Sequence, residues 1–298
     1  MNCKLGSVPV IALCCLAMIA CSRLAAQERN DVERPAKRKN LSWNPPDVDA
    51  PLHALAALPP CDLPKVLKET GARAVELTTN LENFTAQEQI EYKRLDRIGF
   101  PEESDASLFD YVFAFEQRDG RHVSREYRTP AKGGHAFPTS GQDTGQVALA
   151  LIFLPTLQTD YATTCEGLDK WNGQFAWVIH FQQRKDKPSR TIEFRTKEGT
   201  YFPMLKGRAW ISMENSQVLH LETNLMHSAP SADLQSGATS IDYAPVQIQS
   251  RKLELWLPQR VEAYWEISNR RIILYHTFSN FKLFTVETEE NIQKPKIE

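Results

Sequence analysis

The chain has 298 residues, of which 42% are hydrophobic and 24% are charged, so it has the length and composition of a globular protein with one large domain. Its formal net charge is −2. This mildly acidic balance argues against a nucleic-acid partner, because binding nucleic acid requires a basic face.

Residues 1–26 predict a secretory signal peptide. Lys4 supplies a positive start, residues 5–20 are uncharged and mostly apolar, and small residues precede a cut after Ala26. An uncharged run of about 16 residues is shorter than the roughly 20 that a membrane-spanning helix needs. We expect an exported protein, periplasmic or extracellular. Removing Lys4 and Arg23 leaves 33 basic against 37 acidic residues, a mature net charge of −4.

A second signal-peptide cleavage site, directly before Cys21, is the alternative. The residues Met18 to Cys21 resemble a lipoprotein box, in which Cys21 is lipidated and becomes the new N-terminus. Ala20 fits this pattern, but Met18 stands where leucine is usual. We place soluble export first, and we expect membrane association, as an outer-membrane anchor, only if Cys21 is lipidated.

Two cysteines remain in the mature chain. Four of the six lie within residues 1–26, which leaves Cys61 and Cys165. In an oxidising compartment, a pair of cysteines predicts a disulfide, and two buried thiols are the alternative.

The mature chain begins with a segment whose composition is unsuited to a hydrophobic core. Residues 27–60 hold six prolines and eight charges between Glu28 and Lys39, so we predict a disordered linker there. We expect one domain over residues 61–288 and a flexible tail over 289–298.

An amphipathic helix is predicted at the start of the domain. Asp62 is a typical N-cap residue, and Pro64 is tolerated in a first turn. Gly71 weakens a helix by about 1 kcal/mol relative to alanine, so packing must hold it. Apolar or small residues recur at helical spacing to form one buried face: Leu63, Leu67, Thr70, Ala74, Leu77, Leu81 and Phe84.

Strands dominate the rest of the chain. Tyr111, Phe113 and Phe115 alternate before a turn at residues 119–120, which predicts a hairpin. Residues 146–154 are apolar, and we favour a buried helix over a strand there. From Phe175 to Thr285 we count seven or eight short strands without a helical pattern between them, which indicates consecutive antiparallel pairing.

Large apolar side chains share one parity in two of these strands. Phe175, Trp177, Ile179 and Phe181 alternate with other residues, as do Val261, Ala263, Trp265 and Ile267. One interpretation is a cavity for an apolar ligand, and the other, which we favour, is core packing under the sheet. The cavity interpretation gives this lining: Trp177, Ile179, Phe181, Trp265 and Ile267.

Catalytic motifs are missing from the mature sequence. It has no Gly-rich phosphate loop, G-x-S-x-G, H-E-x-x-H or C-x-x-C, and its histidines lack metal-ligand spacing. We therefore predict no catalytic residue, no metal and no cofactor, and we expect a protein that is not an enzyme. An enzyme built on loop residues such as His135 is the least favoured alternative, because no second catalytic group stands beside it in the sequence.

Four segments in order carry a resemblance to a known family: K-G-R-A-W-I-S from Lys206, Q-V-L-H-L-E from Gln217, I-D-Y-A-P-V from Ile241 and L-W-L-P from Leu255. Over about residues 83–285 the chain resembles uncharacterised exported bacterial proteins whose C-terminal half is similar to the outer-membrane lipoprotein carrier (LolA/LolB-like) superfamily. The ligand-handling arginine of those carriers has no matching residue here.

The resemblance implies an α+β fold: a strongly curved antiparallel sheet, an incomplete barrel, with an amphipathic helix and short helices on its concave face. It also implies that this half-barrel holds a lipid or an acyl chain. We expect an envelope protein that binds a hydrophobic ligand. The alternative is a structural module that binds an envelope protein and has a filled core.

Overall fold

The structure, a computed structural model, describes residues 43–52, 60–80, 83–96, 99–118, 121–137, 143–144, 147–189, 193–196, 199–230, 233–248 and 251–284. The predicted signal peptide, Cys21 and the predicted tail at 289–298 lie outside these residues. From Trp43 onward the described residues belong to one compact unit. None of their helices has the length and apolarity needed to cross a membrane.

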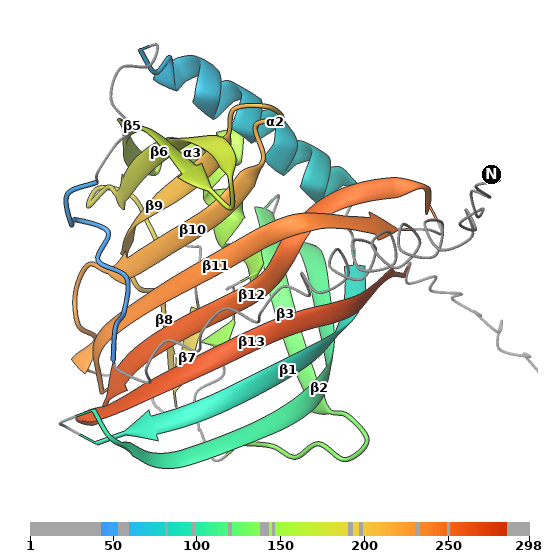
Figure 1. Cartoon of the computed structure of the whole chain (residues 1–298), viewed down its shortest axis with the longest axis vertical. Coiled ribbons are helices and arrows are strands. Elements are labelled where there is room, and N and C mark those ends of the chain that lie inside the picture. Colours follow the sequence, from blue (N-terminus) through green and yellow to red (C-terminus); the bar gives the residue numbers. More distant parts are fainter. Residues whose placement is uncertain are drawn as a thin grey trace, which may run out of the picture. The chain divides into compact units, whose positions relative to one another are not determined.

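A curved antiparallel sheet of ten strands makes up most of the fold (Figure 1). Its strands, in spatial order, are β3 (Arg121–Pro130), β2 (Pro101–Arg118), β1 (Asn83–Leu95), β13 (Arg270–Leu283), β12 (Leu253–Ile267), β11 (Leu234–Ile248), β10 (Val218–Leu225), β9 (Leu205–Ser212), β6 (Gln174–Gln183) and β5 (Tyr161–Trp171). The order ends at β3 and β5, so the sheet does not close on itself, as the predicted fold class requires.

Bulges help this sheet to bend. The pairing register shifts within β1 between Thr85 and Gln87, and within β11 between Asp242 and Tyr243. An extra residue on one strand increases the local twist and bends the strand. A separate three-stranded sheet consists of β4 (Asp143–Thr144), β7 (Glu193–Thr196) and β8 (Gly199–Tyr201).

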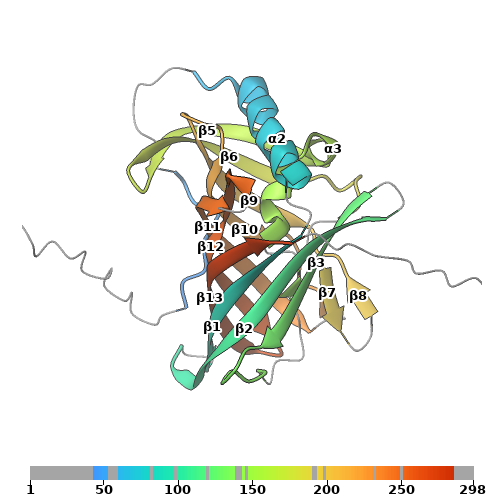
Figure 2. The same cartoon turned by 90° about the vertical axis from the view of Figure 1, so that its right-hand side faces the viewer.

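Three helices pack on the concave face of the ten-stranded sheet (Figure 2). They are α2 (Leu63–Asn80), the 3-10 helix η1 (Val147–Phe153) and the short α3 (Pro155–Gln158). Leu149 and Phe153 of η1 are almost fully buried in the same cluster as sheet residues. The predicted helix over residues 146–154 is therefore present, in its tighter 3-10 form.

Helix α2 begins as predicted. The carboxylate of Asp62 accepts a hydrogen bond from the backbone amide of Lys65, 3.2 Å away, as an N-cap residue does. Gly71 lets the helix approach η1 and α3 closely, because a Cβ there would lie 2.8 Å from Nε2 of Gln158 and 3.2 Å from the carbonyl of Phe153. Packing thus offsets the weak helix propensity of glycine.

The helix predicted from the sequence extends to Phe84, beyond the C-terminal end of α2. Helix α2 stops at Asn80, and Phe84 is a fully buried residue of β1. Phe84 lies in the same core but belongs to a strand. Its distance in sequence from the helix residues happens to match helical spacing, which made the predicted helix too long. The sequence reasoning also missed β1 itself, because Glu88 occupies a buried position of this strand and interrupts its apolar alternation.

The predicted hairpin is confirmed, and so is the strand series, except that β7 and β8 belong to the second sheet and β6 therefore pairs with β9. Strands β2 and β3 pair around the turn, with Arg118 opposite Arg121. Eight strands, β6 to β13, follow Trp171. Strand β5, which precedes them, was missed. A register shift between Cys165 and Gly167 breaks the alternation that would have revealed it.

The predicted disordered linker is wrong over its described part. Residues 43–52 pack on the convex face of the sheet, where Val48 is fully buried. Trp43 joins a small cluster on this face that contains Tyr264 and Ile273, and Leu52 joins another. Both faces of the sheet are therefore partly covered.

A buried ionic cluster connects strands β1, β3 and β13 on the concave side of the sheet. Arg128 of β3 donates to both oxygens of Glu88, at 2.6 and 3.1 Å, and also to Glu126, at 3.2 Å. His276 of β13 lies 2.7 Å from Glu88. Burial opposes ionisation of Glu88, but the charge of Arg128 and the hydrogen bond from His276 outweigh it, so its pKa falls to about 2.

This cluster predicts a pH-dependent stability. The pKa of Glu88 is lower in the fold than its ordinary value of 4.5, so its stabilisation is complete above that value and is lost as the pH falls toward 2. We expect Glu88→Gln to lower the free energy of unfolding by about 3 kcal/mol at neutral pH. The difference from wild type should shrink in acid. Urea unfolding of both proteins over this pH range measures it.

The matched control is Glu91→Gln, an exposed carboxylate on the same strand. It should change the free energy of unfolding by less than about 1 kcal/mol at any pH. A Glu88→Gln penalty that stays constant with pH would contradict the assignment.

Candidate functional site

A groove opens between helix α2 and the sheet. Its volume is about 280 Å³, just below the roughly 300–1,000 Å³ usual for small-molecule sites. One side is the first two turns of α2, and the other is formed by β6, the end of β9 and the turn after it. Its lining residues are Pro60, Asp62, Lys65, Val66, Glu69, Trp177, Ile211, Ser212, Met213 and Ser216.

The lining of this groove is mixed, with apolar and polar side chains in similar number. Val66 comes from the helix, and Trp177 and Ile211 are directly paired across β6 and β9. All three belong to or pack against the main core, so they form a rigid wall. Lys65 and Glu69 stand on the exposed side of the helix, where their charged atoms are 4.0 Å apart. The groove thus places three apolar side chains beside the charged residues Lys65 and Glu69, with Ser212 and Ser216 also in its lining.

Both ends of the groove are fixed by specific bonds. At one end, the disulfide between Cys61 and Cys165 fastens the start of α2 to the edge strand β5. At the other, Ser216 donates to the carboxylate of Glu69 at 3.1 Å. Arg73 donates to the carbonyl of Asn215 at 2.9 Å, next to that contact. The helix cannot move away from the sheet without breaking these contacts.

Exposed apolar side chains stand beside the opening. Met213 lines the groove and is 44% exposed, and Phe175 is 46% exposed. The amide of Met213 donates to the carbonyl of Phe175, so the two residues are backbone neighbours across strands. Lys170 lies 4.5 Å from the centre of the Phe175 ring. An apolar surface with a cation beside it therefore continues outward from the groove.

The five side chains predicted to line a cavity separate into two groups. Trp177 lines the groove. Ile179, Phe181 and Trp265 are at most 3% exposed and belong to the packed core, and Ile267 packs against that core. Core packing, the interpretation that the sequence favoured, describes these four residues.

The groove also has residues that sequence reasoning missed. Val66 lies one position from the predicted stripe on the helix, and Met213 and Ser216 stand in a turn. Ile211 belongs to the K-G-R-A-W-I-S segment, so the motif contained it without indicating its role. Deeper along α2, the buried hydroxyl of Thr70 has no hydrogen-bond partner among the described residues. It lines a second, much smaller cavity of about 30 Å³.

Two of the histidines occupy different environments. His220 is 2% exposed, and its ring stacks on Trp171 at a centroid distance of 3.6 Å. Burial alone would lower its pKa, but the carboxylates of Asp242 and Glu222 outweigh this effect and raise it. His135 is half exposed and lies 2.7 Å from Asp105. Among the described residues, no group of three acidic, histidine or cysteine side chains is arranged to hold a metal.

No family model matches the chain, and no curated protein matches it. Similar solved structures exist. One is a DUF1329 family protein from Desulfovibrio piger, with 10% identity, a TM-score of 0.41 and coverage of 72% of this chain and 92% of that chain. Another is a putative outer membrane lipoprotein-sorting protein domain from Vibrio parahaemolyticus, with 12% identity, a TM-score of 0.42 and coverage of 76% and 94%.

A third is a LolA superfamily protein from Nitrosomonas europaea, with 10% identity, a TM-score of 0.37 and coverage of 76% and 96%. This third structure is from the superfamily that the sequence motifs resemble. Similarity at these levels says nothing about what this chain binds.

The disulfide generates a stability prediction. Cys61 and Cys165 are 104 positions apart in sequence, and a crosslink over such a loop restricts the unfolded chain. The double variant Cys61→Ser, Cys165→Ser should lose about 2–4 kcal/mol of unfolding free energy. Urea unfolding measures the loss, and reduced wild type should behave like the variant. Two free thiols on the denatured, unreduced wild type would contradict the bond.

Proposed function

We propose that this chain is an exported envelope protein that binds the apolar chain of one amphiphile, such as a fatty acid or a lipid acyl chain, in the groove between α2 and the sheet. The observation that carries the proposal is the groove itself, whose mixed lining joins the apolar Val66, Trp177 and Ile211 to charged residues at its entrance. That arrangement suits a ligand with one apolar and one polar end.

The rim residues suit the polar end. Lys65 stands at the entrance and, as a flexible cation, is able to meet a carboxylate or a phosphate of the amphiphile. Its long contact with Glu69 is largely exposed, and such a pair is worth less than about 1 kcal/mol. Lys65 is therefore available to a ligand at little cost to the fold.

The disulfide supports export. Bonds between cysteines persist in oxidising compartments and are rare in the cytosol, and Cys61–Cys165 holds one end of the groove. Cleavage after Ala26, with lipidation of Cys21 as the alternative, stays a prediction from the sequence. The expectation that the chain is not an enzyme also stays a prediction.

A second candidate function is a module that binds an envelope protein and has no ligand. The filled concave face favours it: Phe153 of η1 meets Phe181 of β6 edge to face, and both are about 1% exposed. Because the core is filled, a ligand of the first function would have to bind in the groove beside α2. Purification of a stable envelope partner, together with failure of the experiment below, would favour this second function.

Quenching of tryptophan fluorescence tests the first function. A medium-chain fatty acid brominated near its chain end should quench the mature protein saturably, because bromine quenches a tryptophan that it touches. Trp177→Phe should remove most of this quenching. Trp265→Phe should leave it, because Trp265 is 3% exposed in the core. Quenching that survives Trp177→Phe, or is never saturable, would contradict the proposal.

A pair of lysine variants tests the entrance. Lys65→Phe fills the rim with an aromatic ring and should weaken binding at least tenfold, or about 1.4 kcal/mol. Lys68→Phe is the matched control, since Lys68 is exposed on the same helix but does not line the groove. Equal affinities of the two variants would place the ligand elsewhere.

A further inference from the structure

A short segment on the convex face of the sheet, which we call the strap, consists of residues 43–52. It lies on the face opposite the groove: His180, Lys206 and Arg208 meet it, whereas their strand neighbours Ile179 and Ala209 point into the core. None of the described strand pairings involves the strap. The sheet is therefore complete without it, and side chains alone hold it.

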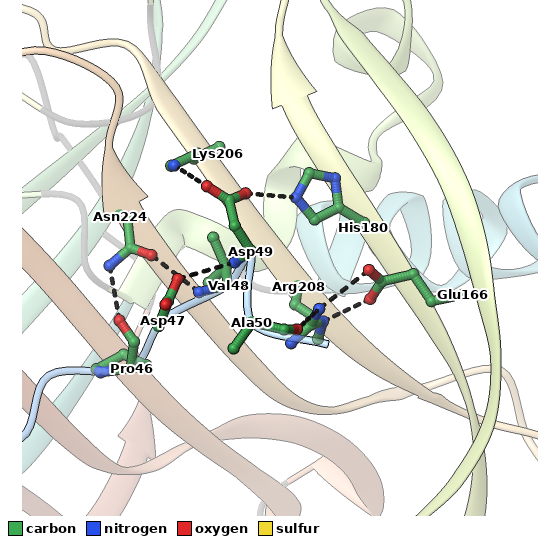
Figure 3. A network of polar contacts seen from close by, with 10 residues as sticks. All are labelled: Pro46, Asp47, Val48, Asp49, Ala50, Glu166, His180, Lys206, Arg208 and Asn224. Atoms are coloured by element: carbon green, nitrogen blue, oxygen red, sulfur yellow. Dashed lines mark hydrogen bonds and ion pairs between the residues drawn. The ribbon is translucent and has the colours of Figure 1, made fainter. Parts of the chain in front are cut away.

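Side chains of the sheet bind the backbone of the strap (Figure 3). The amide side chain of Asn224 on β10 accepts from the backbone amide of Val48 at 3.0 Å and donates to the carbonyl of Pro46 at 2.9 Å. Arg208 on β9 donates to the carbonyl of Ala50 at 2.9 Å. These three bonds recognise a chain path independently of its side chains, as peptide-binding sites do.

Arg208 is held in place for this contact. Its side chain is 6% exposed and forms a two-pronged ion pair with Glu166 of β5. Glu166 is the extra residue of the bulge between Cys165 and Gly167, which turns its carboxylate toward Arg208. The guanidinium is thus oriented by the sheet rather than by the strap.

Two strap side chains add specificity. Val48 is fully buried against the sheet. Asp49 forms an ion pair with Lys206, and its carboxylate lies 3.4 Å from His180. The hydrogen bond from Lys206 lowers the pKa of Asp49, so it is ionised at neutral pH. The site therefore selects an aliphatic residue followed directly by an acid.

The strap has the shape of a preformed ligand. Asp47 closes a turn: its carbonyl accepts from Ala50 at 3.2 Å, and its carboxylate accepts from the amide of Asp49 at 3.1 Å. Pro45 and Pro46 precede this turn and restrict the backbone in the unbound state as well. A segment that is ordered before binding loses less entropy when it binds.

We propose that the convex face of β6, β9 and β10 is a peptide-binding site that the strap fills in cis, and that its ligand in trans is a partner-protein turn of the same chemistry, proline followed by Asp-aliphatic-Asp. This inference is independent of the groove and of the amphiphile. Because the strap is tethered close to its site, its effective concentration is in the millimolar range. A partner segment therefore binds only when it displaces the strap.

A labelled peptide tests this site on the full mature chain. The probe is a fluorescent synthetic peptide with the sequence of residues 42–52, and its anisotropy reports binding. In the variant Val48→Asp the chain's own strap carries a charge at its buried position, so the site is vacated. We expect this variant to bind the peptide saturably and at least tenfold more tightly than wild type does, since wild type retains its competing strap.

Three controls locate the binding. A peptide with the Val48→Asp change should bind at least tenfold more weakly. Adding Asn224→Ala to the Val48→Asp chain should weaken peptide binding at least tenfold, because two backbone contacts are lost. Adding Gln247→Ala should leave it unchanged, since this exposed amide on β11 is bonded to Glu254 and not to the strap.

A second vacating variant covers the case in which Val48→Asp fails to fold. Asp49→Lys places a cation beside Lys206 at a side chain that is 54% exposed, so the fold should tolerate it. It should bind the unmodified peptide in the same way. If both folded variants ignore the peptide, or if either binds the two peptides equally, the strap is a fixed part of the fold and the proposal is overturned.

Discussion

An open sheet with an apolar concave face must be filled from that side, and the rest of this molecule depends on how it is filled. Helix η1 supplies most of the buried side chains, with Leu157 of α3 packed against them. Helix α2 approaches both at Gly71, where no side chain separates it from the Phe153 carbonyl. This close approach sets the height of α2 above the sheet. The groove beside Val66 is the space left where the helix passes the end of η1 and α3 and only the sheet lies beneath it.

Covalent and polar contacts then keep that space constant. The disulfide at Cys61 and the bonds from Ser216 and Arg73 hold the two ends of the groove. A site between two rigid elements keeps its shape without a ligand, so a bound chain loses little affinity to ordering of the protein. Of the five predicted lining residues, Phe181 is covered by Phe153 of η1, which explains why it lies in the core and not in the groove.

The two faces of the sheet perform different physical tasks. The concave face is an apolar core that contains an ionic cluster, in which Glu88 contacts Arg128 and His276. The convex face is a polar surface with aromatic patches, and the strap covers part of it through backbone hydrogen bonds and two side chains. A ligand on one face therefore does not compete with a ligand on the other. The two ligands that we propose, an amphiphile and a peptide, would bind on opposite faces.

The sequence by itself determined the strand-rich class, the start of α2 at Asp62, the β2–β3 hairpin and the apolar parity of β6 and β12, because these depend on local spacing. For Cys61 and Cys165 it favoured a disulfide over two buried thiols, and the structure contains the bond. The sequence could not determine that β1 is a strand or that the strap is ordered, because Glu88 and Val48 owe their burial to partners far away in the chain. Only the tertiary structure decided which apolar side chains border a groove. Trp177 and Ile179 have the same parity, and the position of α2 alone separates them.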